Sequence, residues 1–329
     1  MACQLSGSIH LEMYMSVVVR EDFIHYRGLV RFVVTVAITM LAPQCFVGPL
    51  EAQTAVADVW KPPRTPNGRP DLQGVWLSNT ANPVQRPLAL AGRDYLTEEE
   101  VATLRERADR IFRNGRSAFT TPEGAFFAAL DDVETYHAQS TSSSIGMVDL
   151  EFASRTSLIV APSDGRIPPV TSDGRHRERV VAEGWEFKTG PEDLSNIHRC
   201  ITTGVPRLGG NFGAGPYTYY QIVQTATHLA FISEAFHDVR IIPLDARPHL
   251  PENVRQWNGD SRGHWEGDTL VVQTKNFSPN SYFRGSAEGL QLVEYFTLSR
   301  SDTLTYRMMF ADSTTWASPW VAEIPLKRR

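Results

Sequence analysis

The sequence predicts a mainly β protein whose antiparallel meander curls into a barrel or a sandwich. From residue 155 onward, short runs of β-branched and aromatic residues recur at near-even spacing, and turn residues separate them. No repeat of fixed period is present, which disfavours a propeller or a solenoid. The chain has 329 residues, 42% of them hydrophobic, so it can bury a sizeable core and is not disordered throughout.

The charge balance argues against two classes of partner. Lys and Arg number 32 against 37 Asp and Glu, which gives a net charge of −5. This composition provides no basic surface for nucleic acid and no strong attraction to anionic membranes. We therefore expect a small molecule rather than a polyanion as the partner.

The first 57 residues are expected to be an export signal. Arg27 and Arg31 precede an apolar run at 32–42, the length typical of the hydrophobic part of a signal peptide, and small residues at 55–57 offer a cleavage site. An uncleaved membrane anchor over 29–50 is the alternative, but charged and proline residues interrupt the roughly 20 apolar residues that a spanning helix needs. Export to the periplasm or the extracellular space, without a membrane span after cleavage, is the expectation.

The mature chain is expected to begin near Asp58 and to keep one cysteine. Cys3 and Cys45 leave with the signal, so Cys200 has no partner for an internal disulfide bond. The role of Cys200, the true start codon and the oligomeric state stay open.

Residues 58–329 are expected to form a single mainly β domain, which begins with an extended, proline-rich arm at 58–71. A helix is inserted at 97–114, where Thr97 and Glu100 have the spacing of a capping box. Its apolar residues recur at helical spacing, and this face is expected to pack on the outside of the barrel: Val101, Leu104, Ala108 and Ile111.

The meander itself is expected over 155–329. Residues 122–130 are expected to form a short helix, and residues 170–200 are expected to be mostly charged loop or short helix. The expected strands are 156–160, 217–225, 228–236, 239–244, 269–274, 290–299, 303–312 and 320–326, with residues 266–268 as a hairpin turn.

Five segments resemble a family of uncharacterised exported bacterial proteins that is common in acidobacteria: Pro70–Trp76, Arg155–Val160, Asp164–Pro169, His237–His249 and Gly259–Val272. The resemblance covers the chain from about residue 62 and carries over no activity. Similar proteins continue past the position of Leu326 into a Cys-His-Glu segment, which leaves barrel closure at this end an open question.

A second resemblance concerns the fold. The Gly74-x-Trp76 start and the later Trp265–Val272 hairpin resemble lipocalin-like (calycin) barrels. The resemblance implies an antiparallel lipocalin-like barrel with an N-terminal arm and a helical insertion, completed by the strand at Gly74-Val75-Trp76.

The densest polar group is His237-Asp238-x-Arg240, at a strand junction. An imidazole, a carboxylate and a guanidinium together can supply a general base, its orienting group and an anion clamp. The structural alternative is that Asp238 turns the hairpin and pairs with Arg240. On an extended strand His237 and Asp238 face opposite sides, so they cannot act as a simple dyad.

A charged loop over 257–264 is the second candidate, because loops on a rigid sheet commonly carry binding sites. Its predicted binding residues, with the next aromatic, are Trp257, Asp260, Ser261, Arg262, His264 and Trp265. Trp257, Trp265, Trp316 and Trp320 belong either to the core or to a pocket wall.

Several other chemistries are disfavoured. His264, Glu266 and Asp268 alternate as metal ligands would, but the hairpin turn explains the two carboxylates better, and no metal is predicted. A G-x-S-x-G nucleophile elbow is missing from the sequence. The glycine-rich stretch at 209–215 lacks the Lys-Ser/Thr of a phosphate loop, and no cofactor is predicted.

Two functions are compatible with these observations on the sequence. The first is an exported small-molecule-binding β-barrel whose ligand is acidic or aromatic, held at a barrel mouth that contains His237 and Arg240. The alternative is an acid–base enzyme (a lyase, isomerase or hydrolase) that uses the same residues. An enzyme needs His237 and a carboxylate at one small cavity, whereas a binder needs only an apolar cavity with one polar anchor.

Overall fold

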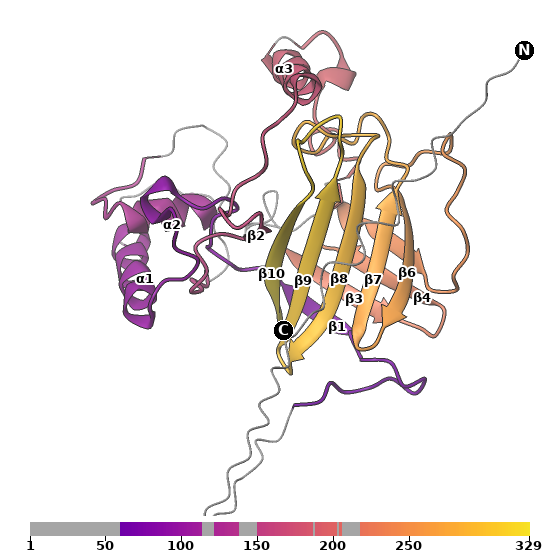
Figure 1. The fold of residues 1–329 in the computed structure, drawn as a ribbon, viewed down its shortest axis with the longest axis horizontal. Helices are drawn as coiled ribbons and strands as arrows, with labels where there is room; N and C mark the ends of the chain where they lie inside the picture. Colours follow the sequence, from indigo (N-terminus) through magenta and orange to yellow (C-terminus); the bar gives the residue numbers. More distant parts are fainter. Residues whose placement is uncertain (1–59, 114–121, 138–149, 187, 203, 206–217) are drawn as a thin grey trace, which may run out of the picture. The chain divides into compact units, whose positions relative to one another are not determined.

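In the computed structural model, strands follow one another around a nearly closed antiparallel barrel in the order of the sequence (Figure 1). The mainly β fold and the barrel are therefore confirmed. The strands are β1 (Gly74–Leu77), β3 (Tyr219–Gln224), β4 (His228–Ser233), β5 (Val239–Pro243), β6 (Asp260–Glu266), β7 (Thr269–Lys275), β8 (Gln291–Arg300), β9 (Thr303–Ala311) and β10 (Trp320–Arg328), and the short β2 (Ile159–Ala161) pairs with β10.

The structure describes residues 60–113, 122–137, 150–186, 188–202, 204–205 and 218–329. The predicted export signal, the cleavage site and the glycine-rich stretch at 209–215 lie outside these residues. Within them, none of the helices has the length and apolar character needed to cross a membrane.

The first and last strands close the barrel against each other. Trp76 of β1 lies opposite Tyr220 of β3 on one side and Arg328 of β10 on the other. The guanidinium of Arg328 stacks over the Trp76 ring at 4.4 Å. Gly74 has a φ of +130°, a backbone conformation that favours glycine there. The predicted closing role of Gly74-Val75-Trp76 is confirmed.

The barrel has one seam, between β5 and β6, where the sheet order ends on both sides. All the neighbouring pairs in the sheet order are antiparallel, so the strand direction reverses at each step. β5 is the first and β6 the ninth strand of this order, and they therefore run in the same direction. Residues 244–259 must therefore return along the length of the barrel. Side chains close the seam: Arg240 Nε donates to Ser261 Oγ at 3.0 Å, and the bare Cα of Gly263 makes room for Leu244 and Ile242.

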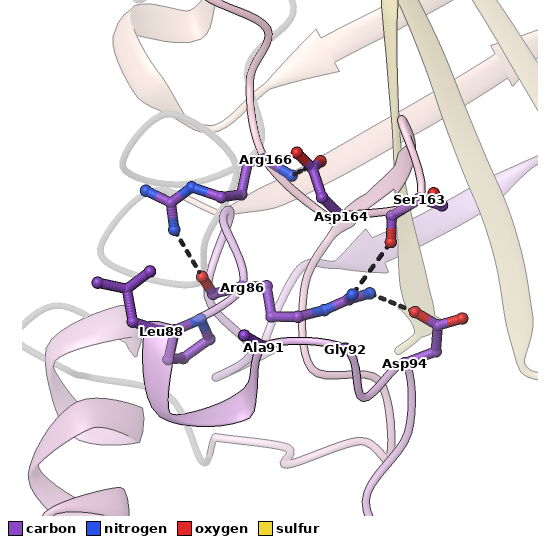
Figure 2. A pocket seen from close by; sticks show the side chains of 9 residues that line it. Arg86, Leu88, Ala91, Gly92, Asp94, Ser163, Asp164 and Arg166 are labelled. Carbon is purple, nitrogen blue, oxygen red and sulfur yellow. Dashed lines mark hydrogen bonds and ion pairs between the residues drawn. The ribbon is translucent and has the colours of Figure 1, made fainter.

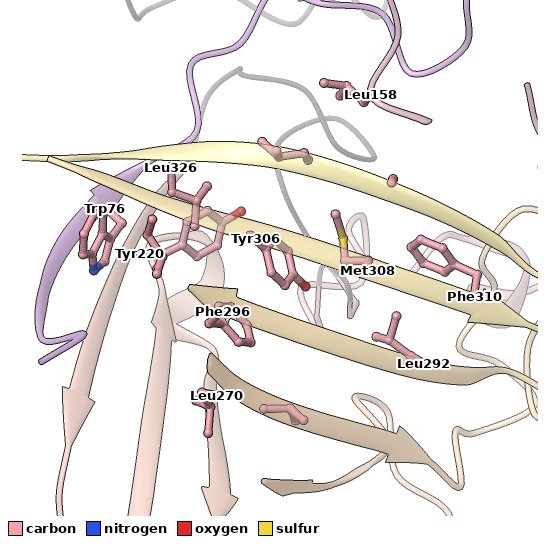
Figure 3. Packing of buried hydrophobic residues seen from close by; sticks show 14 of the residues in the cluster. Trp76, Leu158, Tyr220, Leu270, Leu292, Phe296, Tyr306, Met308, Phe310 and Leu326 are labelled. Carbon is pink, nitrogen blue, oxygen red and sulfur yellow. The ribbon is translucent and has the colours of Figure 1, made fainter. Parts of the chain in front are cut away.

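Large apolar side chains fill the barrel (Figure 3). Phe310 stacks on Trp320 with ring centroids 4.1 Å apart, and Phe296 stacks on Tyr306 at 4.6 Å. Trp316 and Trp320 are fully buried in this core, and Trp265 packs against it. Of the four tryptophans considered as pocket lining, three thus belong to the packing of the barrel and Trp257 is half-buried.

The inserted helices form a second apolar core. Helix α1 (Glu98–Arg113) begins with the predicted capping box, in which the Thr97 N–H donates to Glu100 Oε2 at 2.8 Å and the Glu100 N–H donates to Thr97 Oγ1 at 3.2 Å. Its apolar face is buried as predicted, but it packs with α2 (Pro122–Leu130) and Phe152 rather than with the barrel core.

Two segments differ from the expectation. Residues 172–186 form the 15-residue helix α3 (Ser172–Glu186), where mostly charged loop or a short helix was expected. The sequence did not show its length, because Val180 and Val181 are exposed and no apolar face marks the helix. Residues 260–264 were expected in a loop and are the first part of β6. The inward positions there are Ser261 and Gly263. They are small because β5 side chains fill the space at the seam, and the segment therefore lacks the apolar alternation typical of a strand.

Candidate functional site

Arg240 lies inside the barrel and binds a carboxylate of the same chain. It points inward on β5 with Ile242, as the alternation of the strand predicts. Its Nη1 donates to Glu294 Oε1 at 3.0 Å, and Nη2 forms an ion pair with the other oxygen of Glu294. The Arg240 side chain is 11% exposed and that of Glu294 is fully buried. The anion is thus Glu294 of β8, rather than Asp238, Asp260 or a ligand.

The charges of this cluster are satisfied internally. Burial disfavours the charged guanidinium, but the charge and hydrogen bonds of Glu294 outweigh it and raise the pKa of Arg240. Burial, together with the Glu294 charge, raises the pKa of Tyr306 well above its ordinary value, so its hydroxyl stays protonated and donates to Glu294. Arg240 is an internal ion-pair partner, and its guanidinium is not a free anion clamp.

The other two residues of the predicted catalytic group point elsewhere. Asp238 Oδ2 accepts a hydrogen bond from Thr202 Oγ1 at 2.5 Å and one from Asn258 Nδ2 at 2.8 Å, which ties two loops to the start of β5. His237 is exposed and makes no side-chain hydrogen bond or ion pair with any residue that the structure describes. Asp238 and Arg240 thus bind different partners, and His237 joins neither of them through a side-chain contact.

Asp260 lies at the centre of a second polar group. Its carboxylate binds His249 Nδ1 at 2.8 Å and Arg262 Nη1 at 2.5 Å, and it accepts the Leu250 N–H at 2.9 Å. Asp260 is 4% exposed, and Arg262 Nε also donates to the Pro248 carbonyl. This group fastens the return segment 244–259 to β6. Sequence reasoning included Asp260 and Arg262 but did not single out His249.

The remaining predicted binding residues do not meet at one point. Ser261 faces inward between Arg240 and Thr274, and Trp257 is half-buried. His264 faces outward and its Nε2 lies 2.9 Å from Glu266 Oε1. Asp268, which alternates with them in sequence, instead pairs with Arg64 at 2.8 Å. The described residues contain no group of three side chains suited to hold a metal ion.

A cavity of about 440 Å³ lies beside the barrel, between the chain after β1 and the turn after β2 (Figure 2). Arg86 forms its rigid wall: Nε donates to Thr156 Oγ1 and Nη1 to the Ser163 carbonyl, both at 3.0 Å, and Nη2 pairs with Asp94. The lining residues are Arg86, Pro87, Leu88, Ala91, Gly92, Asp94, Ser163, Asp164 and Arg166.

Arg166 has more unused donors than Arg86, whose Nε, Nη1 and Nη2 are each engaged. Its Nη1 donates to the Arg86 carbonyl at 2.9 Å, and its backbone N–H donates to Asp164 Oδ1 at 3.0 Å. A guanidinium carries five N–H donors, and the other four of Arg166 have no partner among the described residues. Beside it Leu88 is 80% exposed. The Asp164–Pro169 motif was the only sequence signal for this cavity, since residues 86–94 reach it through the fold.

Two further hollows lie on the outer face of β7–β10 and beside α1. None of the three cavities is lined by His237, Arg240 or His264.

Comparisons of the chain with protein-family models, curated proteins and solved structures found no match.

Proposed function

We propose that the protein is an exported β-barrel protein that binds a small organic acid in the cavity beside Arg166. The observation that supports this proposal is a guanidinium with four unpartnered N–H donors in a cavity of about 440 Å³. That volume falls within the range of roughly 300–1,000 Å³ found for small-molecule sites. Guanidinium groups bind carboxylates through two parallel hydrogen bonds.

The charges around the cavity leave this guanidinium available. Asp94 is neutralised by Arg86, and Asp164 accepts the backbone N–H of Arg166 rather than its side chain. Because three hydrogen-bonding groups of Arg86 are already engaged, Arg86 holds the wall in place and does not compete for the ligand. A preformed wall lowers the entropy cost of binding.

The apolar side of the cavity determines the rest of the ligand. Pro87, Leu88 and Ala91 line this side. Leu88 is 80% exposed, so a ligand can remove its apolar surface from water. Complete burial of a leucine side chain contributes about 1.5–3 kcal/mol. The proposed ligand is therefore a carboxylate attached to an aliphatic or aromatic body, in line with an acidic or aromatic partner.

Calorimetric titration with octanoate and phenylacetate tests this function. We expect binding of at least one acid, and its loss in Arg166→Gln because the anion contact is removed. Arg300→Gln is the matched control, since Arg300 is an exposed arginine at the far end of β8. Failure of both acids to bind at millimolar concentration, or equal binding by Arg166→Gln, contradicts the proposal.

Export is a separate part of the proposal, and it has its own measurement. The full chain is expressed in a bacterial host and the intact mass of the periplasmic material is determined. A mass that begins near Asp58 supports cleavage, whereas a full-length mass or retention in the cytoplasm argues against it.

Acid–base catalysis is a second candidate because of one contact, between His249 Nδ1 and the buried Asp260 carboxylate at 2.8 Å. A carboxylate that holds one imidazole nitrogen orients the other as a general base. Hydrolysis of a p-nitrophenyl ester that His249→Gln abolishes and His264→Gln preserves supports this function. Equal rates in the two variants exclude a role for His249.

A further inference from the structure

We infer that the outer face of β7–β10 is a second binding surface, which takes a neutral oligosaccharide. Strands β7 to β10 lie side by side (Figure 1). A hollow of about 530 Å³ lies on their outer face. Its lining residues are Thr269, Tyr295, Thr297, Thr305, Arg307, Met309, Val321 and Glu323. This surface is separate from the cavity of Arg166, and no lining residue is shared.

The strand register arranges these side chains in rows. Tyr295 lies opposite Arg307, and Arg307 lies opposite Glu323, so an aromatic ring, a guanidinium and a carboxylate follow one another across three strands. Adjacent strands are about 4.8 Å apart, which places Tyr295 and Glu323 about 10 Å from each other along the row. The next row is formed by threonine hydroxyls, of which Thr269 and Thr297 are hydrogen-bonded at 2.8 Å.

The polar groups of the central row are not engaged with one another. Arg307 and Glu323 are direct cross-strand neighbours of opposite charge, yet neither forms a side-chain hydrogen bond or an ion pair with any residue in the described part of the chain. The Tyr295 ring is half-exposed, and its hydroxyl likewise has no partner there. A donor, an acceptor and an aromatic face are therefore all presented to the same hollow.

This combination matches the chemistry of a sugar better than that of other partners. A pyranose ring offers an apolar C–H face, which packs on an aromatic ring, and an edge of hydroxyls that both donate and accept hydrogen bonds. Arg307 donates and Glu323 accepts, and their charges cancel, so a strongly charged polymer gains nothing from the pair. Met309 and Val321 add apolar contact at one side of the row without making the surface mainly apolar.

Titration of the full chain with cellohexaose, laminarihexaose and xylohexaose tests the inference. We expect at least one of these sugars to bind, and Tyr295→Ala to weaken it about tenfold or more, which corresponds to about 1.4 kcal/mol. Tyr219→Ala is the matched control, because Tyr219 is 37% exposed on the outer face of β3, away from the hollow. Glu323→Gln is a second variant, which removes the carboxylate acceptor offered to the sugar, and it is used if Tyr295→Ala does not fold.

The outcomes separate this surface from the organic-acid site. Arg166→Gln must leave sugar binding unchanged, whatever its effect on octanoate. Absence of binding to all three sugars at millimolar concentration overturns the inference. Binding that neither Tyr295→Ala nor Glu323→Gln weakens also overturns it, because the sugar then lies elsewhere on the protein.

Discussion

Replacement of Arg240 by methionine should strongly destabilise the barrel. The substitution removes the partner of Glu294, whose side chain is fully buried, and leaves the carboxylate with the Tyr306 hydroxyl and a 3.4 Å contact to Thr274 Oγ1. Loss of one partner of a buried ion pair costs about 3–5 kcal/mol. At about 2–4 °C per kcal/mol for a chain of this size, the melting temperature should fall by roughly 6–20 °C.

The double variant Arg240→Met/Glu294→Leu distinguishes a structural pair from a ligand anchor. Apolar replacement of both partners is commonly neutral or stabilising by about 1–4 kcal/mol, so the double variant should recover most of the loss. Urea unfolding followed by tryptophan fluorescence measures all three proteins. A loss below about 1 kcal/mol in Arg240→Met, or a double variant no more stable than the single one, refutes the assignment of a buried structural pair.

Three further predictions concern the helical core, the seam and pH. Leu104→Ala should cost about 2–5 kcal/mol in urea unfolding, because Leu104 is 4% exposed in the second core. Gly263→Ala should cost about 1–3 kcal/mol, since the new Cβ would lie 2.6 Å from a Leu244 methyl. Burial raises the pKa of Glu123, so the folded protein holds its proton to higher pH than the unfolded chain. Protonated Glu123 therefore stabilises the folded protein at low pH, and this stabilisation is lost as the pH rises through the raised pKa of Glu123. Glu123→Gln should flatten the resulting fall in urea midpoints measured from acidic to neutral pH.

The strands that the sequence predicted well are those whose inward positions are apolar. In β8, Leu292, Phe296 and Leu298 face inward and alternate with outward residues, so the pattern is unmistakable. The same pattern also places Glu294 inward, and a carboxylate at an inward position was the available signal for the partner of Arg240. At β6 the signal fails, because the seam leaves room only for small residues.

The cavity beside Arg166 was not predictable from local sequence. Its two arginines, Arg86 and Arg166, belong to segments 80 residues apart in the sequence. Arg166 connects these segments by a hydrogen bond from Nη1 to the Arg86 carbonyl. Neither segment has a hydrophobic period or a known motif of binding chemistry. Only the tertiary fold shows that Arg86 is engaged through all three of its nitrogens, whereas the Arg166 side chain makes a single hydrogen bond through Nη1.

The pairing of β1 with β10 also constrains when the protein can fold. Trp76 lies opposite Arg328, about 250 residues later, so the barrel cannot close until β10 has been synthesised. Contacts of such sequence separation make folding slow. During synthesis β3 and β4 can pair, but β1 lacks its second neighbour and stays an open edge. Because closure waits for β10, the open edge of β1 is exposed to other strands until residue 328 has been made.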